Sequence, residues 1–90
     1  MNYQINSEKI LFTQVGDEGV VYEVQNNGYT TLSETMFKIL KGVENGQSPS
    51  EITIDLCNEY KIDEITCGQE VVKALKELKE KEYIFEKTNE

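Results

Sequence analysis

Few side chains in this sequence are of a type and spacing that favour catalysis. The chain has no histidine, so it lacks the commonest general base and the commonest metal ligand of proteins. Cys57 and Cys67 do not have the C-x-x-C spacing of zinc sites, and we expect both to be reduced thiols. Ser33 has no base placed to activate it, and Asp17-Glu18 falls in a predicted turn. We therefore expect no catalytic residue, no metal and no cofactor.

The charge balance bears on partners. Seventeen Asp and Glu residues outnumber nine basic residues, all of them lysine, which leaves a net charge of -8. Nucleic-acid-binding domains gain most of their affinity from Lys and Arg that neutralise phosphates, and Arg makes the bidentate contact to guanine. We predict that the chain binds no nucleic acid.

Length and hydropathy predict one small domain, spanning residues 1–90. A chain of this size buries only about 60–65% of its unfolded surface, so its core is too thin to enclose a substrate. The first ten residues are polar and lack the apolar core of a signal peptide. No run approaches the roughly 20 apolar residues of a membrane span. We expect a cytoplasmic protein with no membrane partner.

The first third of the chain has the pattern of three strands. The predicted strands are Ile10–Val15, Val20–Val24 and Tyr29–Leu32, with alternating apolar residues clearest in the second. Asn27-Gly28 is a strong signal for a two-residue type I′ hairpin turn. The pattern predicts a three-stranded antiparallel meander.

Three helices are predicted in the remainder. Ser33 can cap the first, and Ser48-Pro49-Ser50-Glu51 combines a Ser cap, a Pro at the first helical position and a capping-box Glu. The third helix is predicted from Thr66, with Gln69 completing its capping box, to about Tyr83. The expected class is therefore α+β, a winged helix-turn-helix with an N-terminal three-stranded antiparallel sheet followed by three helices.

Four stretches, in this order and spacing, match a known pattern over most of the chain. They are GVVYEV at 19–24, YTTLSE at 29–34 with ILKG at 39–42, the segment from SEI to YKID at 50–63, and EVVKALKEL at 70–78 followed by Tyr83-Ile84. Together they resemble the pyrroloquinoline quinone synthesis protein D family, the prototype of RiPP recognition elements. The chain departs from the family at Ser33, where Asn is usual, at Ala74, where Phe is common, and at Glu82, where Gly often ends the helix.

The resemblance implies a peptide carrier. Members bind the leader of a ribosomally made precursor peptide and present it to a radical SAM protein, a cyclodehydratase or a leader peptidase. The leader adds as a strand beside the third strand, in a groove completed by the third helix. The implied edge is Tyr29, Thr30, Thr31 and Leu32, which carries neither Lys nor Pro to protect it. The alternative is a strand that is merely short or covered by a helix.

The helical period of the third helix places Val71, Ala74, Leu75 and Leu78 on a core face. One flank of that face carries Val72, Lys76, Lys79 and Tyr83, and the other carries Glu70, Glu77 and Lys81. We expect the first flank, with Leu75, to line the peptide groove and to suit a guest with apolar and acidic residues. The alternative is that Lys76 and Lys79 pair with neighbouring carboxylates on a solvated surface.

Other hypotheses remain open. A winged-helix transcriptional regulator or another protein-interaction module fits the order of elements. A small enzyme or a carrier domain fits less well, because Leu32-Ser33-Glu34 lacks the Asp-Ser-Leu of a typical modification site. An open edge strand would also allow two copies to form a homodimer.

Overall fold

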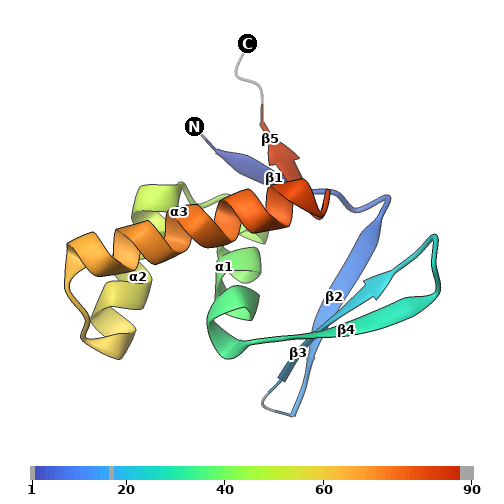
Figure 1. Ribbon diagram of the computed structural model, residues 1–90, viewed down its shortest axis with the longest axis horizontal. Coiled ribbons are helices and arrows are strands. Elements are labelled where there is room, and N and C mark those ends of the chain that lie inside the picture. The colour runs from blue at the N-terminus through green and yellow to red at the C-terminus, as the bar shows by residue number, and fades with distance from the viewer. Residues whose placement is uncertain (1, 17, 88–90) are drawn as a thin grey trace.

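The computed structural model describes residues 2–16 and 18–87 and shows an α+β domain with antiparallel sheets (Figure 1). In chain order, the elements are β1 (Tyr3–Ile5), β2 (Ile10–Val15), β3 (Glu18–Glu23), β4 (Gly28–Leu32), α1 (Glu34–Glu44), α2 (Pro49–Tyr60), α3 (Glu64–Glu80) and β5 (Ile84–Glu86). In Figure 1, β2, β3 and β4 form a sheet at one end of the molecule, and the helices lie together at the other. β4 leads directly into α1 and so connects the two parts.

The predicted meander is present, with the strand order β2-β3-β4. Its register pairs Ile10 with Glu23 across β2 and β3, and Gly19 with Leu32 across β3 and β4. The prediction of a two-residue type I′ turn was wrong. Glu23 pairs with Gly28, so the loop has four residues, 24–27, and Asn27 takes a left-handed conformation with a φ of 52° while Gly28 already belongs to β4.

A second sheet was not anticipated. β1 and β5 pair antiparallel, with Tyr3 opposite Glu86 and Ile5 opposite Ile84. The amide of Asn6 also donates to the carbonyl of Tyr83 at 2.9 Å. The C-terminal tail packs back on the domain as a strand because the N-terminal segment supplies its partner.

The first two helices begin where the sequence indicated. The Ser33 hydroxyl accepts a hydrogen bond from the Met36 amide at 3.1 Å. At α2, the Ser48 hydroxyl accepts from the Glu51 amide, and the Glu51 carboxylate accepts from the Ser48 amide at 2.9 Å. This reciprocal capping box satisfies two backbone donors that the helix itself leaves free.

The predicted bounds of α3 were wrong at both ends. Asp63, not Thr66, is the N-cap, and its carboxylate accepts from both the amide and the hydroxyl of Thr66. At the other end, Glu82 has a φ of 63°, its amide donates to Lys79 and the Tyr83 amide donates to Leu78. This pair of bonds is a Schellman motif, which closes the helix three residues before Tyr83. Lacking the usual Gly, the chain places Glu82 in the left-handed position.

One apolar core joins the inner face of the sheet to the helices. Ile10, Val21 and Leu32 contribute from the strands, and Leu40 and Leu75 are among the buried helical residues. The sheet and α1 lie close together at Gly19, because a Cβ there would lie only 2.6 Å from the Cβ of Phe37. The glycine therefore allows α1 to sit against β3 just where β4 ends.

Candidate functional site

The edge strand β4 is the first component of the candidate site. It is hydrogen-bonded to β3 on one side, and its other side is an open edge of the three-stranded sheet. Alternation along the strand directs Thr30 and Leu32 toward the helices and Tyr29 and Thr31 toward the opposite face. Tyr29 is 75% exposed, whereas Leu32 is buried. The structure thus presents the predicted four-residue edge.

A cleft begins directly after this edge. It has a volume of about 600 Å³ and lies between the start of α1, the end of α2 and one flank of α3. Its lining starts at Ser33, the residue that follows β4. The other lining residues are Thr35, Met36, Ile39, Leu56, Tyr60, Ile62, Cys67, Glu70, Val71, Lys73, Ala74 and Glu77. The floor is apolar, and charged residues from α3 lie along its rim.

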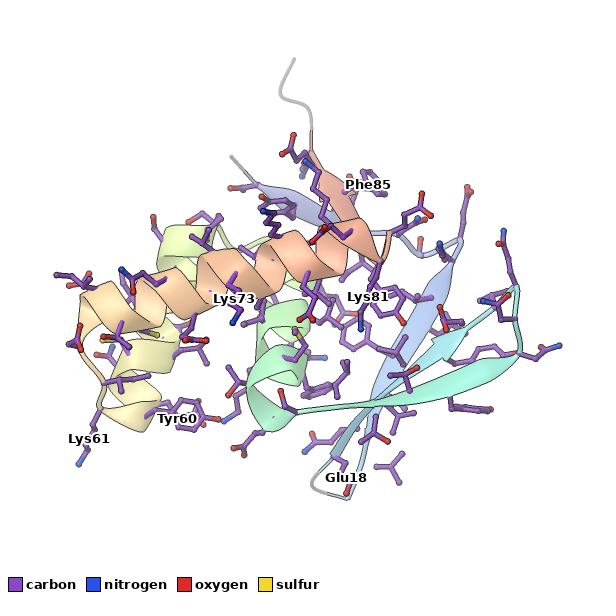
Figure 2. All side chains as sticks on the ribbon, in the orientation of Figure 1. Glu18, Tyr60, Lys61, Lys73, Lys81 and Phe85 are labelled. Carbon is purple, nitrogen blue, oxygen red and sulfur yellow. The ribbon has the colours of Figure 1, made fainter. Side chains whose placement is uncertain are left out.

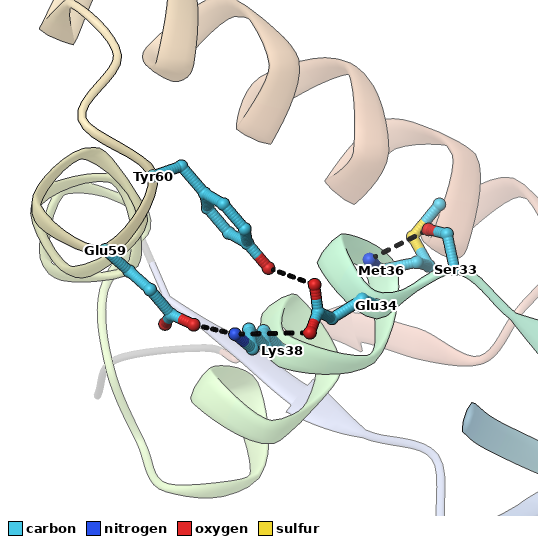
Figure 3. A network of polar contacts seen from close by, with 6 residues as sticks. All are labelled: Ser33, Glu34, Met36, Lys38, Glu59 and Tyr60. Carbon is cyan, nitrogen blue, oxygen red and sulfur yellow. Dashed lines mark hydrogen bonds and ion pairs between the residues drawn. The ribbon is translucent and has the colours of Figure 1, made fainter. Parts of the chain in front are cut away.

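A polar network holds the mouth of the cleft (Figure 3). The Tyr60 hydroxyl donates to Glu34 at 2.9 Å, and Lys38 pairs with both Glu34 and Glu59. The Lys38 ammonium also lies 4.9 Å from the centre of the Tyr60 ring. Exposed pairs of this kind are each worth only about 0–1 kcal/mol. Their combined effect is to link the end of α2 to the first turn of α1 and to orient the ring at the cleft.

The C-terminal end of α3 approaches β4 at Tyr83. Its phenol is buried, and burial raises the pKa of Tyr83, with a further increase from the charge of Glu23 and an opposing hydrogen bond involving Thr30 of β4. Lys81 lies over the same ring, with its ammonium 5.9 Å from the ring centre. Figure 2 shows Lys73 and Lys81 extending from the side of α3 that faces β4 in that view. This flank of the helix therefore borders the space beside the edge strand.

The α3 residues predicted from the sequence lie elsewhere. Val72 and Lys76 line a second cleft of about 720 Å³ between α3 and the N-terminal part of α2, and Lys79 pairs with Glu86 of β5 at 2.8 Å. This hydrogen bond is also the main cause of the raised pKa of Lys79. Leu75 is buried in the core. The structure does not bring these four residues to the β4 edge.

The geometry of α3 explains why the predicted residues lie away from β4. At about 100° per residue, Val72, Lys76 and Lys79 lie on one side of the core stripe, and Glu70, Lys73 and Glu77 lie on the other. Both flanks were recognised in the sequence, but the period alone does not say which one turns toward the sheet. Lys73, Ala74 and Glu77 were missed as cleft residues. Met36 could have indicated the cleft from the sequence, because it continues the apolar stripe of α1. In the structure its half-buried side chain lines the same cleft.

The residues within 2–16 and 18–87 do not form a group of three or more Asp, Glu, Cys or His side chains able to hold a metal ion. Cys57 and Cys67 are free thiols, and burial raises the pKa of Cys67. In the same part of the chain, no helix is both long enough and apolar enough to span a bilayer.

The model of one protein family, described as Coenzyme PQQ synthesis protein D (PqqD), matches residues 18–84. No curated protein matches the chain. Two solved structures resemble it over 96% of its length.

The first of these is TbiB1 in complex with the TbiA(beta) leader peptide, which is 26% identical, is covered over 99% of its chain and superposes with a TM-score of 0.82. The second is lasso peptide synthetase B1 complexed with the leader peptide, with 19% identity, 100% coverage and a TM-score of 0.83. At that identity the second structure bears on the fold alone.

Proposed function

Because the chain belongs to the family of coenzyme PQQ synthesis protein D, we propose that it binds the leader of a ribosomally made precursor peptide and presents it to the enzyme that processes that precursor. The likeness to TbiB1, whose structure contains a leader peptide, supports this proposal. The observation that carries it is the open β4 edge running into an apolar cleft.

The edge accounts for the main-chain part of binding. A strand with unpaired N–H and C=O groups can add an extended peptide, and the main-chain hydrogen bonds provide affinity that does not depend on the guest's side chains. The edge residues in this proposal are Tyr29, Thr30, Thr31 and Leu32. A guest paired along all of β4 needs about five residues, because its rise per residue matches that of the strand.

The cleft accounts for selectivity. We propose that one apolar side chain of the leader, placed just beyond the paired stretch, enters between Met36 and Ala74. The rim residues Glu70, Lys73 and Glu77 alternate in sign, which suits a leader with both acidic and basic residues near the anchor. The expectation from the sequence, based on Lys76 and Lys79, was a guest with apolar and acidic residues. The Ala at 74, where Phe is common in the family, leaves more room for the anchor.

The rest of the proposal concerns the setting. We propose that the chain performs no catalytic step itself, that its partner is a radical SAM protein, another modifying enzyme or a leader peptidase, and that it acts in the cytoplasm. We also propose a winged helix-turn-helix arrangement for α1–α3 and the meander. A regulator with that arrangement would bind DNA with a steep salt dependence, and the net charge of -8 opposes this.

Matched substitutions on the two flanks of α3 test the proposal. Ala74→Trp fills the cleft and should weaken binding of a fluorescein-labelled leader, taken from the precursor encoded beside this chain, by at least about tenfold in fluorescence anisotropy. Val72→Trp, on the other flank and 63% exposed, should leave the Kd within about twofold. Circular dichroism melts of both variants check that the fold is intact.

Three outcomes would contradict this function or its placement. A wild-type chain that binds no nearby leader at micromolar concentration removes the function. An unchanged affinity in Ala74→Trp removes the cleft, and a loss confined to Val72→Trp restores the flank predicted from the sequence. Pairing of two copies through β4, the alternative use of an open edge, would appear as a dimer in sedimentation that the leader dissociates.

A further inference from the structure

The outer face of the β2–β4 sheet is almost free of charge. The register puts Leu11, Tyr22 and Tyr29 in one cross-strand row, and Thr13, Val20 and Thr31 in the next. Val15 follows on β2, opposite Glu18. The alternate residues of the same strands, such as Ile10 and Val21, face the core and are buried. Within these three strands, Glu18 at the hairpin end is the charged residue of the outer face.

This composition is unusual for a solvated sheet face. Antiparallel sheets that cover a core on one side normally carry polar residues on the other. Here 29% of the chain is charged, yet the charges avoid this face. Leu11 is 59% exposed, Val15 is 63% exposed, and the rings of Tyr22 and Tyr29 pack 4.9 Å apart at their centres. Exposed apolar and aromatic side chains on a face with few charges favour an interaction site there.

We propose that this face docks the enzyme that processes the leader, through an uncharged apolar surface on that enzyme. The inference rests on the proposed function, because it assigns the presenting step to a surface distinct from the leader cleft. The cleft lies on the helix side of the sheet, whereas Leu11, Tyr22 and Tyr29 point away from the helices.

Continuity with the β4 edge supports this occupant. Tyr29 and Thr31 belong both to the edge strand and to the outer face. A leader strand added to β4 would extend the same sheet, and every second side chain of the leader would continue the same face. A protein seated on the outer face would therefore contact the domain and the leader together, as a leader-processing enzyme must.

Charge distinguishes this occupant from a second copy of the chain. Two copies would each bring a net charge of -8, and their long-range repulsion would oppose association at low salt. An uncharged face surrounded by an acidic molecule is better matched by a neutral or basic partner. An enzyme with an uncharged docking surface would not be repelled by the charge of this chain.

The test uses substitutions on β2, the strand farthest from the leader edge. Leu11→Lys and Val15→Lys, made separately, each place a charge on the outer face and should weaken binding of the purified leader-processing enzyme from the same gene cluster by about tenfold. Gln14→Lys is the control, since it adds the same charge to the same strand on the other face, where Gln14 is exposed. Enzyme binding is measured by biolayer interferometry with the immobilised full chain, and leader binding by anisotropy.

The outcomes separate this inference from the proposed function. Weaker enzyme binding in the two outer-face variants, with unchanged leader anisotropy and an unaffected Gln14→Lys, supports the docking face. Enzyme binding that these variants leave unchanged, or a wild-type chain that does not bind the enzyme, overturns it. Self-association that Leu11→Lys abolishes overturns it in favour of a second copy. A wild-type chain that does not bind the leader instead refutes the proposed function.

Discussion

Gly19→Ala tests a close approach between the sheet and α1. The added Cβ would lie 2.6 Å from both the Cβ and the Cδ1 of Phe37. Rotating the Phe37 ring does not relieve the contact, because its Cβ is held by the helix backbone. The φ of Gly19 is not in the left-handed region, so an alanine there meets a steric conflict and no backbone conflict.

The magnitude follows from two opposing effects. Overpacking a well-packed core costs about 1–3 kcal/mol, and replacing Gly with Ala returns about 0.4–1 kcal/mol by restricting the unfolded chain. The net expected loss is about 1–2 kcal/mol of unfolding free energy, which lowers the Tm of a domain of this size by about 5–15 °C. Such a loss is a large fraction of the stability of a small domain.

Urea denaturation followed by circular dichroism measures this loss. Gly28→Ala is the matched control, since its nearest neighbour would be the Glu23 carboxylate at 4.0 Å, and it should be neutral or slightly stabilising. In a double-mutant cycle, Phe37→Ala removes Cγ and Cδ1 but keeps Cβ, so it should cancel about 0.5–1 kcal/mol of the Gly19→Ala loss. Gly19→Ala with a wild-type urea midpoint, or additivity with Phe37→Ala, would refute the steric argument.

Two further predictions concern the ends of helices. Asp63→Ala should lower the Tm at pH 7. The hydrogen bond from the Thr66 amide lowers the pKa of Asp63 below its ordinary value of 3.8. The stabilisation that this carboxylate gives is therefore complete above about pH 4 and is lost as the pH falls through the pKa of the folded state. The Tm difference from wild type should therefore narrow at pH 2, and a constant difference would contradict the capping role. Lys61→Gly should raise the unfolding free energy by about 0.5–1 kcal/mol, because Lys61 ends α2 with a φ of 55°, and an unchanged urea midpoint would argue against strain there.

The parts of the fold that local signals specify were predictable. The caps Ser33 and Ser48 act on backbone groups within three residues, so the sequence alone located the starts of α1 and α2. The start of α3 was ambiguous because Asp63 and Thr66 are both good caps three residues apart. Asp63 prevails, and the Thr66 hydroxyl donates to it instead of capping the helix itself.

The parts that depend on distant residues were not predictable. β1 and β5 are three residues each and pair across nearly the whole chain, so neither has a periodic pattern of its own. The flank of α3 that lines the cleft was not predictable for a related reason. Periodicity orders Lys73 and Lys76 around the helix axis, but the direction in which the helix packs on the sheet decides which of them meets the cleft.

The small β1–β5 sheet has a consequence for engineering. Because Tyr3 pairs with Glu86, the two ends of the described chain leave the domain side by side, and Figure 1 shows them on the side of the helices opposite to β4. A host protein could therefore accept this domain within a surface loop, with one short spacer at each junction. In a sensor built in this way, the β4 edge would stay free to bind its peptide, and both junctions would adjoin the β1–β5 sheet.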